Sequence, residues 1–235
     1  MIVSTVTQQS VGGRPGSVLF LEKRMRKWPQ VLAGLPSHIQ VVDLSADFRL
    51  RDVNAYAEWY GGEHKAPELQ KEAVYGLTEL HREAVSGARL VANPGCYPTC
   101  AQLPLAPLLA ARAISPHGIT IDAKSGVSGA GRAAKEAFLF CEVTEGMHAY
   151  GVSSHRHMPE IEQGLTEAND GEQVTVSFTP HLIPMSRGMQ STIYVQLAEG
   201  QSADSLRQKL ASRYQDERFV RCATPCCYHA MMLLD

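Results

Sequence analysis

A strand-to-helix corner around Cys96 is the feature that most constrains how this chain folds. An apolar run ends at Ala92, Pro94-Gly95 follows as a turn signal, and residues 100–111 form a second apolar run rich in Ala and Leu. The first run predicts the end of a buried strand, and the second predicts a helix. Cys96 therefore lies at the corner between the two.

This position suggests a chemical role for Cys96. The unpaired N–H groups and the macrodipole at a helix N-terminus favour an anion, so a thiol there loses its proton below the usual pKa of about 8.5. The resulting thiolate is a nucleophile. The alternative is a buried, inert cysteine, which is common in apolar surroundings. Cys100, one helical turn further into the apolar run, suits that inert role better.

A second strand is expected upstream, over residues 39–45. This run is apolar and rich in β-branched residues, as in strands buried within a parallel sheet. Residues 45–50 leave its carboxyl end, where open α/β sheets bind their ligands. Arg49 is therefore a candidate for holding an anionic group, and a solvated or salt-bridged arginine is the alternative.

A loop of small residues follows a third expected strand, residues 119–123. Residues 124–132 include three glycines, with a cation at each end. Without Cβ atoms, the backbone N–H groups of such a loop can closely approach a phosphate or a carboxamide. The order Gly-x-x-Gly-x-Gly matches neither the Rossmann nor the P-loop spacing, so a flexible connector is an equal alternative.

Two histidines precede a predicted helix. Pro159 suits the first turn of that helix, which leaves His155 and His157 on an extended lead-in where they point to the same side. They are surface histidines, metal ligands or a general acid/base. No cluster of carboxylates or cysteines completes a metal site nearby, so no metal is expected. The acid/base role is favoured if Cys96 is a nucleophile, because its reaction needs a group that carries protons.

The second half of the chain has a different pattern. Residues 173–180 and 190–197 alternate apolar and polar side chains, which predicts an antiparallel sheet with one covered face, and residues 203–214 predict an amphipathic helix. The expected fold class is therefore α/β plus α+β. A remnant of a Rossmann-type parallel sheet is followed by a catalytic domain with a mostly antiparallel sheet.

Composition excludes several classes of protein. The 235 residues carry a net charge of −2 with both signs interspersed, so neither a nucleic acid nor an anionic membrane is an expected partner. Apolar runs are broken well before the ~18 residues that a membrane span needs, and an apolar signal core is missing. The six cysteines do not form the framework of a small secreted domain. We therefore expect thiols and a cytoplasmic location.

Five ordered motifs within residues 31–220 together resemble N-acetyl-gamma-glutamyl-phosphate reductases, enzymes of arginine biosynthesis. They are DLSADFR (43–49), NPGCYPT (93–99), SGVSGAGR (125–132), HRHMPEI (155–161) and FTPHL (178–182). That family is similar in fold to aspartate-semialdehyde and glyceraldehyde-phosphate dehydrogenases. The resemblance implies a partial dinucleotide-binding domain over residues 1–95 and a catalytic domain over residues 96–235.

The resemblance also implies a reaction and its cofactor. NADP(H) would reduce N-acetyl-glutamyl phosphate, a small-molecule substrate, to the semialdehyde through a thioester on Cys96. His157 would be the acid/base, with His155 and Arg49 near the substrate carboxylate or phosphate, although the two imidazoles can exchange roles. The residues expected beside the nicotinamide are Ser125, Gly126, Ser128, Gly129, Ala130 and Gly131. The intact enzyme would be a homo-oligomer.

Both ends of the chain depart from this family. Residues 1–30 show neither a strand-turn-helix pattern nor a dinucleotide fingerprint, and no pattern continues after about residue 221. We therefore expect a truncated or frame-disturbed chain that binds NADPH weakly or not at all, with the strand at Val41 left without its central neighbours. A catalytically impaired fragment and a cysteine-dependent acyl hydrolase are the alternative functions.

Overall fold

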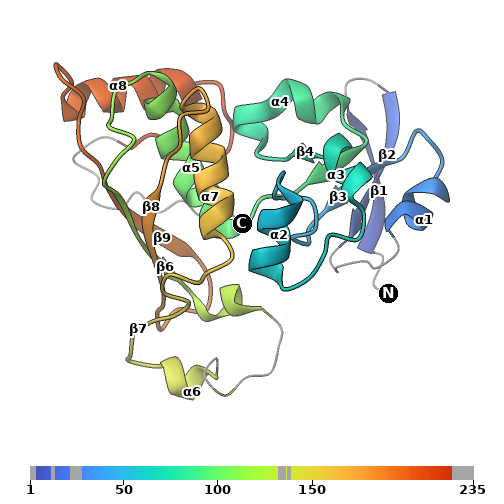
Figure 1. The fold of residues 1–235 in the computed structure, drawn as a ribbon, viewed down its shortest axis with the longest axis horizontal. Coiled ribbons are helices and arrows are strands. Elements are labelled where there is room, and N and C mark those ends of the chain that lie inside the picture. Colours follow the sequence, from blue (N-terminus) through green and yellow to red (C-terminus); the bar gives the residue numbers. More distant parts are fainter. Residues whose placement is uncertain (1–3, 12–13, 22–27, 132–135, 137–138, 224–235) are drawn as a thin grey trace. The chain divides into compact units, whose positions relative to one another are not determined.

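The computed structural model describes residues 4–11, 14–21, 28–131, 136 and 139–223 (Figure 1). The chain divides into two compact units, Met1–Cys96 and Tyr97–Asp235, which we call the first and the second unit. Within the described residues, no helix combines the length and the apolar character that a membrane crossing requires.

In its described residues, the first unit has a five-stranded sheet and four short helices. Its elements are β1 (Ser4–Val11), β2 (Arg14–Leu21), α1 (Trp28–Ala33), β3 (Gln40–Asp43), α2 (Val53–Tyr60), α3 (Pro67–Glu72), β4 (Val74–Tyr75), α4 (Thr78–Gly87) and β5 (Leu90–Ala92). The strand order is β1-β2-β3-β5-β4. All neighbouring strands are parallel except β1 and β2, which form an antiparallel pair. The predicted Rossmann-type parallel sheet is confirmed.

The N-terminal segment is more regular than its sequence indicated. Residues 4–11 and 14–21 form β1 and β2, and β2 pairs with β3 in parallel from Val18↔Gln40 to Leu21↔Asp43. The expectation of a β3 strand without central neighbours is therefore wrong, since β2 and β5 flank it and Val41 is 0% exposed. The short apolar run over residues 18–21 has no alternation, as is usual for a buried parallel strand. Residues 22–27, which join β2 to α1, lie outside the described residues.

A small apolar core holds the ends of β3 and β5 in place. Its buried members are Leu32, Val41, Phe48, Ala66, Leu90 and Ala92. These residues come from α1, from β3 and β5, and from the segments that follow β3 and precede α3. Burying them fixes the carboxyl ends of two adjacent parallel strands, which is the edge where α/β sheets place their ligand sites.

The second unit combines a four-stranded mixed sheet with helices. Its elements follow α5 (Cys96–Ala110), which begins at the last residue of the first unit, and they are β6 (Ile119–Ser125), the 3-10 turn η1 (Val127–Ala130), α6 (Phe140–Val143), β7 (His148–Ala149), α7 (Met158–Ala168), β8 (Val176–Leu182), β9 (Met189–Tyr194) and α8 (Ala203–Tyr214). The strand order is β7-β8-β6-β9. Two of the three pairs are antiparallel and β6–β8 is parallel, so the mostly antiparallel sheet is confirmed. However, β8 and β9 do not pair with each other, because β6 lies between them.

One face of this sheet is packed, and α5 and α7 are held tightly together. Alternate residues of β6 and β8 are buried, among them Ile121 and Phe178. Gly164 of α7 allows the approach of α5, because a Cβ atom there would lie 2.2 Å from Gln102 Oε1. Gln102 Nε2 also donates to the backbone oxygen of Glu160 at 3.2 Å. These contacts fix the N-terminus of α7 relative to α5.

Candidate active site

Cys96 is the first residue of α5, four residues earlier than the sequence pattern predicted for the start of the helix. Its thiol is not part of a disulfide within the described residues and is exposed, whereas Cys100 is only partly exposed. Pro98 does not prevent the earlier start, since proline is tolerated in the first turn of a helix. The predicted position of Cys96 at a helix N-terminus is thus confirmed, and that position favours a thiolate.

Hydrogen bonds from the end of β3 hold the turn before Cys96. The backbone N–H of Asn93 donates to the backbone oxygen of Asp43 at 2.8 Å. Arg49 Nε donates to the Asn93 oxygen at 2.8 Å, and Arg49 Nη2 donates to the Leu44 oxygen at 3.2 Å. Arg49 is buried, so the alternative of a solvated side chain is wrong. Its guanidinium joins the ends of β3 and β5 beside Cys96, and its contact with a substrate anion stays a prediction.

A buried polar network that the sequence analysis missed supports this turn. Asp43 accepts hydrogen bonds from the backbone N–H and the hydroxyl of Ser45, both at 2.9 Å, and the Ser45 hydroxyl accepts from the Asp47 N–H at 3.2 Å. Tyr56 Oη donates to Asp47 Oδ1 at 2.9 Å. Burial raises the pKa of Asp43 to about 6, against the lowering effect of the Ser45 hydrogen bonds. The alternating polar residues 43, 45 and 47 after a buried strand were the available signal.

Residues 151–157, which we call the histidine turn, carry both candidate imidazoles. The segment is not the predicted extended lead-in, because Gly151 and Ser153 both have φ 56° and His157 has a helical conformation just before α7. The turn still brings the rings of His155 and His157 together, with centroids 4.8 Å apart. The prediction that the imidazoles are neighbours is confirmed, although its reason was wrong.

The structure distinguishes the two imidazoles chemically. The backbone N–H of His157 donates to His155 Nδ1 at 3.1 Å, so a neutral His155 ring carries its proton on Nε2. Burial, with the Arg156 cation as a smaller cause, lowers the pKa of His155 to about 4. His155 is therefore neutral at neutral pH. It can meet a substrate as a hydrogen-bond donor but not as a cation.

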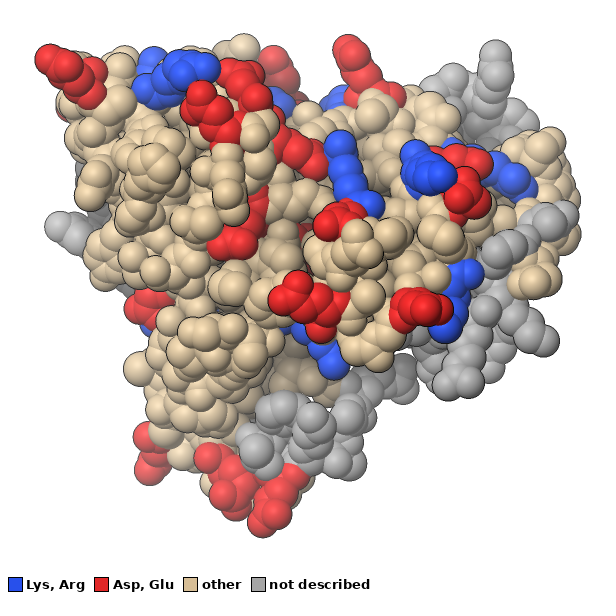
Figure 2. All heavy atoms as spheres, viewed as in Figure 1, with Lys and Arg blue, Asp and Glu red and all other residues tan. Residues whose placement is uncertain are grey.

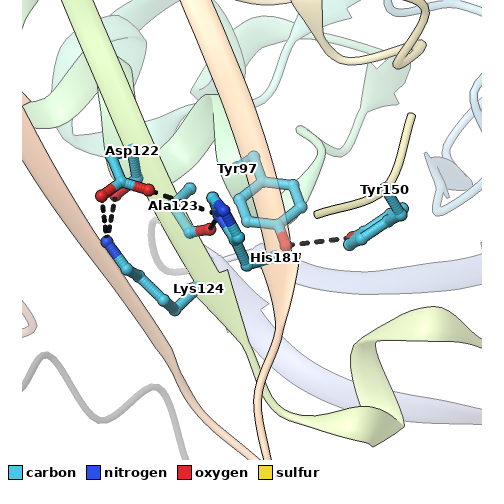
Figure 3. Close-up of polar contacts among 6 residues, drawn as sticks. All are labelled: Tyr97, Asp122, Ala123, Lys124, Tyr150 and His181. Carbon is cyan, nitrogen blue, oxygen red and sulfur yellow. Dashed lines mark hydrogen bonds and ion pairs between the residues drawn. The ribbon is translucent and has the colours of Figure 1, made fainter. Parts of the chain in front are cut away.

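Aromatic side chains surround the histidines. Tyr97, the residue after Cys96, packs against His155 and His157 with ring centroids 5.5 and 5.9 Å away. Tyr150 and Phe178 each lie 5.5 Å from His155. The Tyr97 and Tyr150 hydroxyls are 3.0 Å apart (Figure 3). Neither tyrosine was singled out from the sequence, because nothing in the spacing of residues 97 and 150 indicates a contact.

The loop of small residues 124–132, which we call the glycine loop, has five N–H groups that donate to backbone oxygens. The N–H groups of Gly126, Val127 and Ser128 donate to backbone oxygens of residues 188, 185 and 186, at 2.9, 2.8 and 3.1 Å. Those of Gly129 and Gly131 donate to oxygens within the loop. Residues 185–188 take up the first three of these donors and the loop itself takes up the other two, so a phosphate would have to compete with existing hydrogen bonds. The approach of the loop to a phosphate or a carboxamide stays a prediction. A Cβ atom at Gly126 would lie 2.8 Å from the backbone nitrogen of Arg187.

Charged side chains lie on the other face of β6. Lys124 contacts Asp122, and His181 Nδ1 of β8 lies 3.3 Å from Asp122 Oδ1 (Figure 3). Lys124, one of the two cations expected to flank the glycine loop, is thus paired with a carboxylate. The other, Arg132, lies outside the described residues. On the face that Figure 2 shows, basic and acidic side chains of the described residues are interspersed.

Comparison with known proteins then identifies the family. Residues 96–231, more than half of the chain, match the family model described as semialdehyde dehydrogenase, dimerisation domain. The chain belongs to the semialdehyde dehydrogenase family. The structure of an aspartate semialdehyde dehydrogenase from Francisella tularensis has the same fold, with a TM-score of 0.57 at 13% identity, over 90% of this chain and 70% of that one.

Two relatives with high sequence identity show a more specific resemblance. A protein named N-acetyl-gamma-glutamyl-phosphate reductase from Rhodospirillum rubrum is 63% identical over 183 residues, which are 78% of this chain and 52% of that protein. A protein from Oryza sativa subsp. japonica, named Probable N-acetyl-gamma-glutamyl-phosphate reductase, chloroplastic, is 62% identical over 82% of this chain and 46% of its own length. The resemblance to these reductases is confirmed. The chain spans about half the length of the relatives it matches.

Proposed function

We propose that this chain belongs to an NADP(H)-dependent N-acetyl-gamma-glutamyl-phosphate reductase, which reduces N-acetyl-glutamyl 5-phosphate to N-acetyl-glutamate 5-semialdehyde in arginine biosynthesis. The observation that carries the proposal is the exposed Cys96 thiol at the first residue of α5. The identity of more than 60% to proteins of that name supports the choice of substrate.

Cys96 acts as the nucleophile in this reaction. The helix N-terminus stabilises its thiolate, whose sulfur forms a bond to the γ-carbonyl carbon of the substrate. The C–O bond to phosphate breaks, phosphate leaves, and a thioester remains on Cys96. The Cys96 N–H at the start of the helix is suited to hold the oxyanion. Breaking the C–S bond of the thiohemiacetal later releases the aldehyde and regenerates the thiolate.

His157 serves as the acid/base at the thiohemiacetal. The pKa of His155, about 4, supports this assignment, because a ring that stays neutral is poorly matched to proton transfer near neutral pH. We place His155 near the substrate as a neutral donor through Nε2. Arg49, at the turn before Cys96, is placed near the substrate phosphate or carboxylate.

The residues of the glycine loop fit only part of the cofactor. NADP(H), when bound, supplies the hydride that reduces the thioester. A phosphate would have to compete with the existing hydrogen bonds of the Gly126, Ser128, Gly129 and Gly131 N–H groups. The likeness of the loop motif to that of the reductases supports placing Ser125, Gly126, Ser128, Gly129, Ala130 and Gly131 beside the nicotinamide end.

We further propose a division of labour and an assembly for the whole enzyme. Residues 1–95 form part of the dinucleotide-binding domain, and residues 96–235 form part of the catalytic domain. The match to a family model named for dimerisation supports a homo-oligomer. The cytoplasmic location rests on the sequence alone.

The test is phosphate-dependent oxidation of N-acetyl-glutamate semialdehyde with NADP⁺, followed by the absorbance of NADPH. Cys96→Ser should abolish the rate while leaving the circular dichroism spectrum unchanged, and Cys100→Ser, the matched control, should keep most of it. A substantial rate in Cys96→Ser removes Cys96 from the mechanism. Cys96-dependent release of N-acetyl-glutamate without NADP⁺ would favour an acyl hydrolase, and an inactive but folded chain would favour an impaired fragment.

A further inference from the structure

A pair of tyrosine hydroxyls joins the first turn of α5 to the histidine turn. Tyr97 Oη lies 3.0 Å from Tyr150 Oη (Figure 3). Tyr97 is 2% exposed and follows Cys96 directly. Tyr150 directly precedes the histidine turn, and its backbone N–H donates to the Pro180 oxygen of β8 at 3.0 Å. The hydroxyl contact therefore connects the helix of Cys96 with the segment that carries the imidazoles.

The rings of the same two tyrosines also form the walls around the imidazoles. Tyr97 meets His155 at 84° and His157 at 68° between ring planes, and Tyr150 meets His155 at 69°. Edge-to-face contacts of this kind depend on ring orientation. A rotation of either tyrosine would therefore change the surroundings of His155.

The histidine turn needs such support from outside. Gly151 and Ser153 both have φ 56°, a left-handed conformation that costs free energy at a serine. A Cβ atom at Gly151 would lie 3.3 Å from His155 Cδ2, so the turn also packs closely on the ring it carries. A turn with an unfavourable backbone persists when surrounding contacts fix it.

We propose that Tyr97 and Tyr150 are a positioning pair, whose hydroxyl contact fixes His155 and His157 relative to the first turn of α5. The role in catalysis rests on the proposed function, in which an imidazole serves the Cys96 thiol. The positioning itself does not, and it can be measured without turnover. Neither hydroxyl is assigned a contact with substrate.

The first test observes the imidazoles directly. Ring ¹⁵N–¹H spectra of the full chain are recorded against pH for wild type, Tyr97→Phe, Tyr150→Phe and the double variant. Either single change should shift both ring signals and move the His155 pKa from about 4 toward 6.5. The double variant should resemble the singles, because the contact is already lost in each of them. Tyr194→Phe, which removes an exposed hydroxyl from β9, should change nothing.

Two results of this test would exclude the positioning role of the Tyr97–Tyr150 contact. Ring signals that stay unchanged in the single variants exclude positioning through the hydroxyls. If the shifts of the ring signals add in the double variant, each hydroxyl acts alone, and the contact between the hydroxyls does not position the rings.

The second test measures turnover. Tyr150→Phe should lower kcat by about tenfold with KM changed less than about twofold, as expected when catalytic groups are misplaced rather than removed. If the wild type is active and Tyr150→Phe has the same kcat, the pair has no role in catalysis, even if the ring signals shift. If the wild type has no reductase activity but the ring signals of the tyrosine variants shift as expected, the proposed function is refuted. The positioning role of the pair is then still supported.

Discussion

The imidazole of His155 should make the stability of the second unit depend on pH. Its pKa is about 4 in the folded chain, against an ordinary value of 6.5, because the ring is buried and Arg156 lies beside it. The unfolded chain therefore takes up this proton at a higher pH than the folded chain, and protonation favours unfolding. The contribution of His155 is full above pH 6.5 and falls as the pH falls toward 4.

The size of the effect follows from these two values. Between about pH 7.5 and about pH 5, a fully shielded ring would reduce stability by about 2 kcal/mol. The ring is partly exposed, so solvent screening lowers the expected loss to about 1–2 kcal/mol. His155→Gln takes up no proton and should lose this part of the pH dependence. His148→Gln is the matched control, since His148 is exposed on β7.

Hydrogen exchange of buried amides in β6 and β8 is the suitable assay. These strands belong to the second unit, whereas both tryptophans, Trp28 and Trp59, lie in the first, so tryptophan fluorescence would report the wrong unit. Wild type and His148→Gln should lose more protection between the two pH values than His155→Gln. An equal loss in all three proteins, or a ring pKa of His155 near 6.5 by NMR, would show that the His155 ring does not cause the pH dependence.

Other predictions concern Asp43, His157 and Gly126. First-unit stability should rise by about 1 kcal/mol from about pH 7.5 to about pH 5, because the raised pKa of Asp43 lets the folded chain take up the proton first; Asp43→Asn should flatten this rise in urea titrations followed by tryptophan fluorescence. His157→Asn should lower turnover by about 10²–10⁴ with a smaller change in KM, and the reverse split between the histidines would exchange their roles. Gly126→Ala should cost about 1–3 kcal/mol of unfolding free energy, because its Cβ would lie 2.8 Å from Arg187 N. Gly146→Ala, whose Cβ would meet nothing nearer than 3.9 Å, should cost little; because both glycines belong to the second unit, hydrogen exchange of buried amides in β6 and β8 measures the two variants.

Local patterns predicted the elements that carry the site, because burial imposes those patterns directly. The apolar runs before Cys96 and over residues 119–123 became β5 and β6, and the apolar run after Cys96 became α5. The pairing of strands was harder to predict. Residues 18–21 were overlooked as a strand, and β6 was not expected between β8 and β9, because partners distant in sequence leave no local signal.

The same limit applies to the candidate site. Cys96 was predictable because a turn and a helix start are local features. The hydrogen bonds of the glycine loop could not be predicted, because three of its N–H groups donate to residues 185–188, which lie far along the sequence. The difference between His155 and His157 depends on burial and on one backbone hydrogen bond. The Tyr97–Tyr150 contact likewise exists only in the folded chain.

The proposed function depends on the transfer of the substrate's acyl group to Cys96. Peptide mass spectrometry after mixing the chain with N-acetyl-glutamyl phosphate, without NADPH, tests it most directly. We expect one N-acetyl-glutamyl adduct on the peptide that contains Cys96, retained in Cys100→Ser, absent in Cys96→Ser, and discharged as semialdehyde when NADPH is added. No adduct, or an adduct that persists in Cys96→Ser, would contradict this transfer to Cys96.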